Sequence, residues 1–293
     1  MRSVFIGPLG LRSGWRIAIF CLAVTAAILG WNFAAWALIP DLFSGPTAAL
    51  IPLTASNLIP TLAISWLCAR LIDQDGLKAV GLDGGPLKAI AEVAAGAALG
   101  IGLIAASWGI VALLGGASIA WKSPDLLSFL LWSAILLAAA TWEEVLFRGY
   151  AFGWLRKGIG RWGATGLCAA IFTAAHLTNP NITAIGALSI GLASAMLCLS
   201  RFLAGDRLWW PIGLHWGWNF AQGMLFGVAI SGIDDGDGTI PAMARSTLSG
   251  PDWLTGGDFG FEGSAGTVGL LIVACVLLIV ALRAHPRTPG PDA

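Results

Sequence analysis

The sequence has few charged residues for its length. Asp, Glu, Lys and Arg make up 11% of the 293 residues, while 57% are hydrophobic. A soluble domain carries about 25% charged residues, and much of its surface must face water. This composition therefore excludes an ordinary soluble enzyme and a disordered chain. It leaves a polytopic membrane protein whose outer wall faces lipid.

Several familiar chemical signatures are also missing. The formal net charge is +0, so the chain lacks the basic excess of a nucleic-acid-binding protein. The five cysteines are odd in number, form no CxxC pair and lie in apolar stretches, which predicts small buried side chains without disulfides. The sequence contains no HExxH, GxSG-type serine elbow, GxGD aspartate or Walker A loop.

Long apolar stretches dominate what is present. A spanning helix needs about 20 apolar residues. Eight stretches approach or exceed that length: 15–39, 48–72, 87–114, 126–155, 162–177, 182–202, 209–230 and 266–282. We therefore predict an all-α membrane protein with a bundle of about eight transmembrane helices.

The basic residues predict the orientation of this bundle. If the chain crosses the membrane eight times, only Lys122 and Arg245 of the 16 Lys and Arg residues lie on the side of the membrane opposite the amino terminus. Loops rich in Lys and Arg stay in the cytoplasm. Both termini should therefore be cytoplasmic, and the acidic segment 231–264 should form an extracytoplasmic loop.

The chain reads as one membrane domain over residues 1–293, with the informative motifs in a core over 126–230. Glycines four residues apart allow helices to approach closely. In a chain with 39 glycines such spacings arise by chance, so we give them little weight. They occur at Gly96/Gly100, Gly149/Gly153 and Gly213/Gly217.

Ionisable residues inside spans are the best guide to function. Each costs about 2.5–3.5 kcal/mol at the centre of a span. Glu143, Glu144 and Arg148 lie in the fourth stretch, so they must face the bundle interior or water. Glu144 and Arg148 are spaced to pair along one helix face. Glu143 points about 100° away and has no cation on its own helix.

Two of the three histidines complete a polar set. His176 ends the fifth stretch, and His215 shares a helix face with Asn219 on the seventh. His285 lies beside Pro286 in the tail, where we expect it to be solvated. On straight, ideal spans His176 comes out near the outer edge, so it reaches Glu143 only if the fifth span is tilted or displaced.

These residue types suit amide hydrolysis by activated water. A glutamate and a histidine can hold and deprotonate a water molecule. A second histidine and an asparagine amide can donate hydrogen bonds to an oxyanion. Two histidines and one glutamate, here Glu143, His176 and His215, would also suit zinc with one open position.

The order Glu143-Glu144-x-x-x-Arg148, Phe172-x-x-x-His176 and His215-x-x-x-Asn219 resembles the CPBP, or Abi, family of intramembrane proteases, which includes the type II CAAX prenyl endopeptidases. The resemblance implies that Glu143 activates water with help from His176. It implies that His215 and Asn219 stabilise the oxyanion. It assigns supporting roles to Glu144, Arg148 and Phe172.

The resemblance leaves the cofactor open between a divalent metal such as zinc and a metal-free mechanism. It implies a multi-pass protein of the plasma or inner membrane, acting on a peptide or protein substrate that carries a lipid group in some relatives. The lipid bilayer is the other expected partner, and no nucleic acid is expected.

Two other functions compete with an endopeptidase. A non-catalytic membrane partner or immunity protein could use the same polar cluster for binding. An ion-coupled transporter would also bury carboxylates, although paired repeats with broken helices are missing.

Overall fold

The structure is a computed structural model that describes residues 2–7, 10–40, 50–233 and 239–284. His285 lies outside the described residues. The elements in chain order are α1 (Arg2–Phe5), β1 (Ile6–Gly7), β2 (Gly10–Leu11), α2 (Ser13–Leu38), α3 (Leu50–Ser56), α4 (Leu58–Leu71), α5 (Leu77–Val80), α6 (Pro86–Leu113), β3 (Ala117–Trp121), α7 (Leu126–Arg148), α8 (Tyr150–His176), α9 (Ala184–Leu203), α10 (Trp209–Phe220), the π-helix η3 (Ala221–Leu225), β4 (Ala244–Leu248), α11 (Asp252–Thr255), the 3₁₀ turns η4 (Gly257–Phe259) and η5 (Phe261–Gly263), and α12 (Ala265–Ala284).

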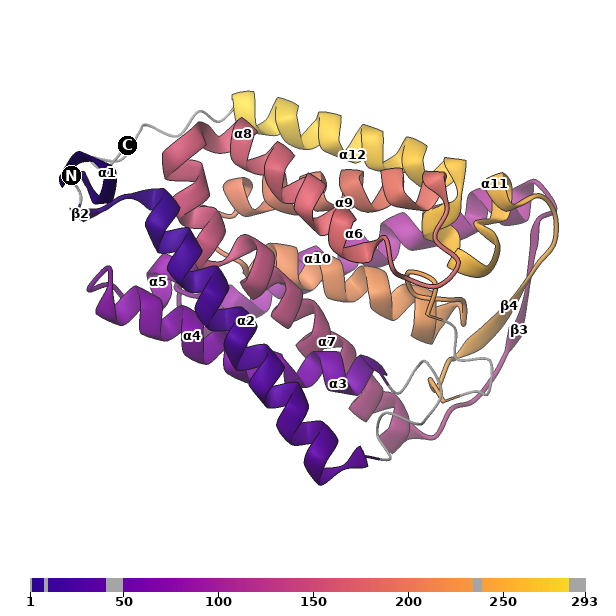
Figure 1. Cartoon of the computed structure of the whole chain (residues 1–293). Helices are drawn as coiled ribbons and strands as arrows, with labels where there is room; N and C mark the ends of the chain where they lie inside the picture. Colours follow the sequence, from indigo (N-terminus) through magenta and orange to yellow (C-terminus); the bar gives the residue numbers. More distant parts are fainter. Residues whose placement is uncertain (1, 8–9, 41–49, 234–238, 285–293) are drawn as a thin grey trace.

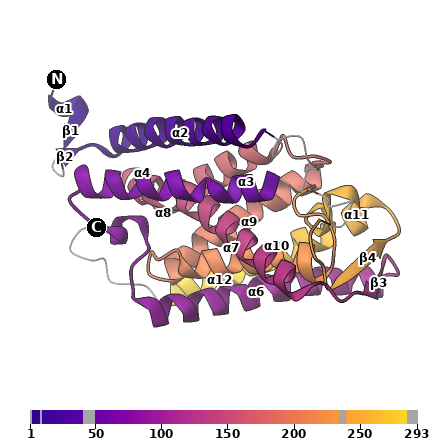
Figure 2. The same ribbon diagram turned by 90° about the horizontal axis from the view of Figure 1, so that it is seen from below.

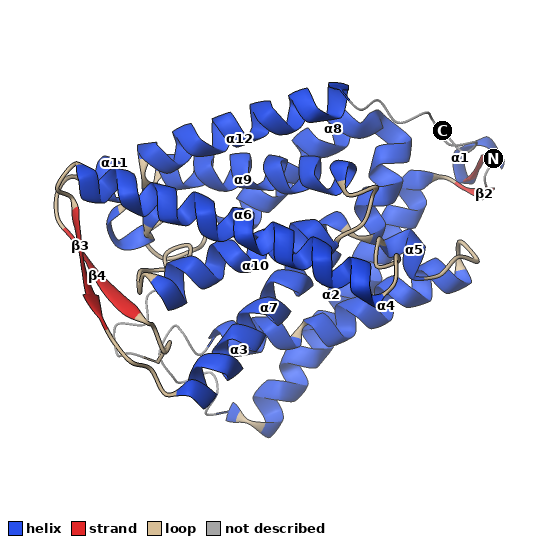
Figure 3. Cartoon of the chain, turned by 180° about the vertical axis from the view of Figure 1, so that it is seen from behind, coloured by secondary structure: helices blue, strands red, loops and turns tan. Residues whose placement is uncertain are grey.

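The long helices form a layered bundle (Figure 1). Helices α7 to α10 lie in the middle, with α2 and α4 on one side and α6 and α12 on the other (Figure 2). About 75% of the structure is helical, and the strands among the described residues are short and lie at the two ends of the bundle (Figure 3). The predicted all-α class is confirmed.

Many large apolar side chains lie on the outside of the bundle. On α2, Leu22 and Phe33 are 74% and 67% exposed, and on α12 Leu277 is 62% exposed. Six helical segments of the described chain are long and apolar enough to cross a membrane: Ser13–Leu38, Ile51–Leu71, Pro86–Leu113, Leu126–His176, Ala184–Leu203 and Ala265–Ala284. The chain is a multi-pass membrane protein, and the number eight stays a prediction.

The fourth and fifth predicted spans have different bounds in the structure. Helix α7 ends at Arg148 instead of continuing to residue 155, and α8 begins at Tyr150 instead of residue 162. The break falls at Gly149, whose φ/ψ of −83°/−123° are not helical. A second break divides α8 at Gly160, which has a φ of 74° that favours glycine. The chain therefore breaks at Gly149, where apolar composition indicated a continuous helix, whereas Gly160 falls between the predicted fourth and fifth spans.

Each end of the bundle groups segments that the eight-span prediction places on one side of the membrane. At one end β3 and β4 form an antiparallel ladder from Ala117↔Leu248 to Trp121↔Ala244, which joins the segment after α6 to the predicted loop 231–264. The described part of that loop therefore contains a paired strand. At the opposite end lie α1 and the carboxyl end of α12 (Figure 1). Which end faces the cytoplasm stays a prediction.

The start of α7 is fixed by a side-chain cap. The carboxylate of Asp125 accepts a hydrogen bond from the backbone N–H of Ser128 at 2.8 Å. This bond satisfies one of the amide groups left unpaired at a helix start, and it lowers the pKa of the Asp125 carboxyl. The cap thus sets where the helix that carries Glu143 begins.

Glycines bring α6 and α10 into backbone contact. A Cβ added at Gly96 or Gly100 would collide with backbone atoms of α10, and one at Gly213 or Gly217 would collide with backbone atoms of α6. The low weight given to these two spacings was therefore wrong, because the two pairs face each other on neighbouring helices. Gly149/Gly153 makes no such helix pair, since the nearest neighbour of a Cβ at Gly153 is 3.7 Å away.

Candidate active site

Glu144 and Arg148 form the buried base of the site. Both side chains are 0% exposed, and Arg148 Nη1 donates to Glu144 Oε1 at 2.7 Å, one turn along α7. Arg148 Nη2 also donates to Ser194 Oγ on α9 at 2.6 Å. The predicted ion pair is therefore present, and it ties α7 to α9.

His215 is attached to the same carboxylate. Its Nδ1 lies 2.8 Å from Glu144 Oε1, which thus contacts both Arg148 and His215. Since Oε1 of an ionised carboxylate can only accept, Nδ1 carries the proton and donates it. This bond leaves Nε2 as the free ring nitrogen and fixes the orientation of the ring.

His176 is oriented by the residue one turn before it. Its Nδ1 lies 2.8 Å from the carbonyl oxygen of Phe172, so this nitrogen also donates and Nε2 is again free. The two rings lie 4.3 Å apart between centroids. The ring of Phe172 also contacts Arg148, whose guanidinium lies 4.4 Å from the ring centroid. Phe172 thus packs between the ion pair and His176.

Glu143 meets both free imidazole nitrogens. Its Oε2 lies 3.8 Å from Nε2 of His176 and 3.8 Å from Nε2 of His215. Both distances exceed a hydrogen bond, yet one water about 2.8 Å from each atom could bridge either gap. Oε2 is buried and lacks a hydrogen-bond partner among the described residues. The expected convergence of these three side chains from α7, α8 and α10 is thus present, while their catalytic roles stay predictions.

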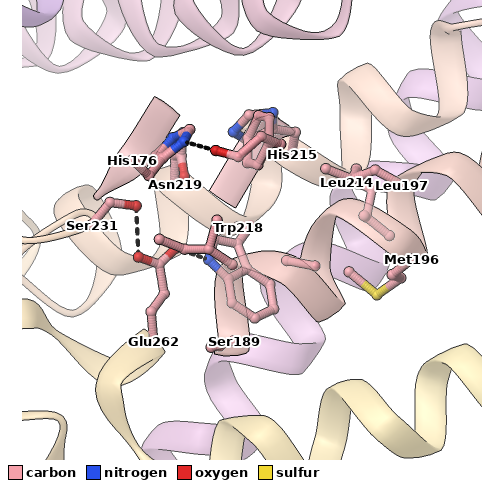
Figure 4. A pocket seen from close by; sticks show the side chains of 13 residues that line it. His176, Ser189, Met196, Leu197, Leu214, His215, Trp218, Asn219, Ser231 and Glu262 are labelled. Carbon is pink, nitrogen blue, oxygen red and sulfur yellow. Dashed lines mark hydrogen bonds between the residues drawn. The ribbon is translucent and has the colours of Figure 1, made fainter. Parts of the chain in front are cut away.

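A small cavity opens beside the histidines. His176, His215 and Asn219 all line it (Figure 4). Its volume is about 40 Å³. One water occupies about 10–15 Å³ on this measure, so the cavity can hold a few water molecules. Glu143 does not line the cavity itself, but it lies next to the two histidines that do. Within the described part of the chain, the Asn219 amide makes no hydrogen bond, so it can serve a bound group.

The donor set has the chemistry of a metal site but not the spacing. Typical zinc ligands are imidazole nitrogens and carboxylate oxygens, and both kinds are present here. The two imidazole rings also donate hydrogen bonds through Nδ1, as zinc-binding histidines usually do. Ligand atoms on a tetrahedral zinc ion lie about 3.3 Å apart, because the bonds are about 2.0–2.1 Å. The separations of 3.8 Å are longer, and the described residues contain no group of three or more His, Cys, Asp or Glu that could hold a metal ion. As placed, the residues do not fit zinc.

The sequence reasoning missed four residues around the site. Ser194 supports Arg148, and Arg201 donates to the backbone carbonyls of Arg148 and Gly149, fixing the end of α7. Ser189 and Glu262 line the cavity. The sequence did contain a hint of the serines, because Ser189, Ser194 and Ser200 are polar residues within one apolar span. In the structure all three are 0% exposed. Glu262 gave no signal, since it lies among the acids of the predicted loop.

Comparison with known proteins agrees with the motifs. Residues 125–221 match a family model named Rce1-like, which is described as "Type II CAAX prenyl endopeptidase Rce1-like". This range contains α7 to α10, and with them Glu143, His176, His215 and Asn219. No curated protein and no solved structure matches the chain. Over residues 125–221, which hold these four central helices, the chain is similar to the Rce1-like family of type II CAAX prenyl endopeptidases.

Proposed function

We propose that the protein is an intramembrane endopeptidase that hydrolyses a peptide bond with water activated by Glu143. The observation that carries this proposal is the placement of one carboxylate oxygen 3.8 Å from two imidazole nitrogens that are both free to act. A water in this gap donates one hydrogen to Glu143 Oε2 and the other to His176 Nε2, which directs its oxygen lone pairs away from both groups.

Hydrolysis then proceeds by proton transfers on the chain's own residues. Glu143 takes a proton as the water oxygen attacks the substrate carbonyl carbon, and it returns that proton to the leaving amine when the C–N bond breaks. The Asn219 amide and His215 Nε2–H stabilise the oxyanion. Because Nδ1 of His215 already donates to Glu144, this second donor requires the doubly protonated ring.

The charges of the site balance in that state. Glu143 and Glu144 carry two negative charges, and Arg148 and the protonated His215 carry two positive charges. Each buried charge then has a partner of opposite sign, and a buried charge without such a partner is strongly unfavourable. Glu144 therefore keeps His215 doubly protonated, so that Nε2–H can donate a hydrogen bond. This role explains why the chain has two adjacent glutamates, of which only Glu143 contacts the attacking water.

The spacing of the three donors supports the metal-free alternative. We therefore derive no step through a metal, and cleavage should persist in the presence of a chelator. The substrate is a peptide or protein segment next to the bilayer, and a lipid group on it, like a plasma-membrane location, is an expectation carried by the family resemblance.

The test is peptide cleavage by the full chain in lipid nanodiscs. A pool of apolar peptides is incubated with the protein, and the products are identified by mass spectrometry. The wild type and Glu92→Gln should cleave, while Glu143→Gln should not. Glu92 is the matched control because it is a partly buried glutamate paired with Arg207 outside the site. Equal cleavage by Glu143→Gln and the wild type would refute the proposal.

A further inference from the structure

A second carboxylate lines the cavity beside the histidines. Glu262 lies in η5, at the end of the predicted loop, and is 7% exposed. Its Oε1 accepts a hydrogen bond from Trp218 Nε1 at 2.6 Å, and its Oε2 accepts one from Ser231 Oγ at 2.6 Å (Figure 4). Trp218 belongs to α10, which also carries His215 and Asn219. Glu262 is thus held at a fixed point of the same cavity.

This carboxylate has no cation of its own. Among the described residues, no Lys, Arg or His lies within 4 Å of it to form an ion pair. An ionised carboxylate offers about four acceptor positions, and only two are used. A buried negative charge without a cation is costly. The cavity therefore favours a positively charged group.

A buried hydroxyl points to the same kind of ligand. Ser189 on α9 lines the cavity, is 0% exposed, and its Oγ has no hydrogen-bond partner in the described part of the chain. Ser231, which holds Glu262, also lines the cavity and has a φ of 49°, a strained backbone for a residue other than glycine. Oxygens of Glu262, Ser189 and Ser231 together present three acceptors to one small space.

We propose that Glu262, Ser189 and Ser231 form a subsite that binds a primary ammonium group of the peptide substrate. The proposal rests on the proposed endopeptidase function. An ammonium group has three N–H donors for the three acceptors and is compact enough for a cavity of about 40 Å³. A planar guanidinium is larger, and a substrate carboxylate would be repelled. Because the subsite and the histidines share one cavity, the ammonium group lies close to the bond that is cleaved.

Binding of three synthetic peptides to the full chain in nanodiscs tests this subsite. The peptides are apolar and identical except at two points. One has a central lysine and an acetylated amino terminus, one has norleucine and a free amino terminus, and one has norleucine and an acetylated terminus. The lysine peptide and the free-terminus peptide distinguish the two sources of an ammonium group.

We expect the wild type to bind at least one ammonium peptide about 10- to 100-fold more tightly than the neutral peptide, the range for a hydrogen bond to a charged group. Glu262→Gln keeps the side-chain shape and the bonds to Trp218 and Ser231, and it should abolish this preference. Asp258→Asn removes an exposed acid of the same loop and should preserve it. Ser189→Ala should reduce it.

Two results would overturn the subsite. One is equal affinity of the wild type for all three peptides, or no binding of any. The other is a Glu262→Gln variant that weakens all three equally, which indicates a structural role alone. Cleavage is followed in the same samples. Ammonium preference without cleavage would refute the proposed function and keep the subsite, whereas cleavage without preference would do the reverse.

Discussion

Removal of the Arg148 side chain should strongly destabilise the fold. In Arg148→Met the Glu144 carboxylate stays 0% exposed and loses its guanidinium partner. The variant also loses the hydrogen bond to Ser194 and the contact with the Phe172 ring. Breaking a buried pair from one side costs about 3–5 kcal/mol, a large fraction of the 5–15 kcal/mol that stabilises a typical domain.

The matched control is an ion pair near the surface of the same protein. Arg156 pairs with Asp206 at 3.0 Å, with side chains 36% and 41% exposed. An exposed pair contributes about 0–1 kcal/mol, so Arg156→Met should change stability by no more than that. The double variant Glu144→Gln/Arg148→Met should be more stable than Arg148→Met alone, because it also removes the buried carboxylate that has lost its guanidinium partner.

The assay is the free energy of unfolding, measured by reversible denaturation in mixed detergent micelles with helical circular dichroism as the signal. The reasoning is refuted if Arg148→Met is as stable as Arg156→Met. It is also refuted if the double variant is less stable than the single one.

Three further outcomes follow from the structure. Gly100→Ala should destabilise by about 1–3 kcal/mol, because its Cβ meets the α10 backbone, whereas Gly102→Ala, with open space around its Cβ, should stay within about 1 kcal/mol in the same denaturation assay. Asn219→Ala should lower kcat about 10²- to 10³-fold with little change in KM, and an effect on KM alone would contradict its role at the oxyanion. Cleavage by purified protein should be unchanged after treatment with 1,10-phenanthroline, and loss of activity that zinc restores would show that a metal completes the site.

The positions of the long helices could be predicted well from the sequence, but the breaks within them could not. Long apolar stretches require helices in lipid, because backbone groups have no water to bind there. Composition could not locate the break at Gly149, because the residues around it are mostly apolar and its φ/ψ angles depend on neighbouring helices. The kink at Gly160 lies in the charged stretch 156–161 that was expected to separate two spans, and there α8 continues on both sides of the glycine. The close approach of α6 at Gly96 and Gly100 to α10 at Gly213 and Gly217 was similarly hidden, because spacing along one helix does not identify the partner helix.

The polar residues of the site were readable because charge is expensive inside a membrane. That cost singled out Glu143, Glu144 and Arg148, and helical spacing joined His215 to Asn219. Their partners were harder to foresee. Whether Glu144 binds Arg148 alone or also His215 depends on how α7 and α10 face each other, and Glu262 reaches the cavity only because the chain returns to the bundle through η5.

The central claim is that Glu143 and His176 act on one water molecule, and a double-mutant cycle tests it most directly. The single-turnover rate of peptide cleavage is measured for the wild type, Glu143→Gln, His176→Ala and the double variant. If both side chains hold the same water, the double variant should be within about tenfold of the slower single variant, because groups that act as a unit are lost together. Losses that multiply, or a Glu143→Gln variant as fast as the wild type, would contradict the account.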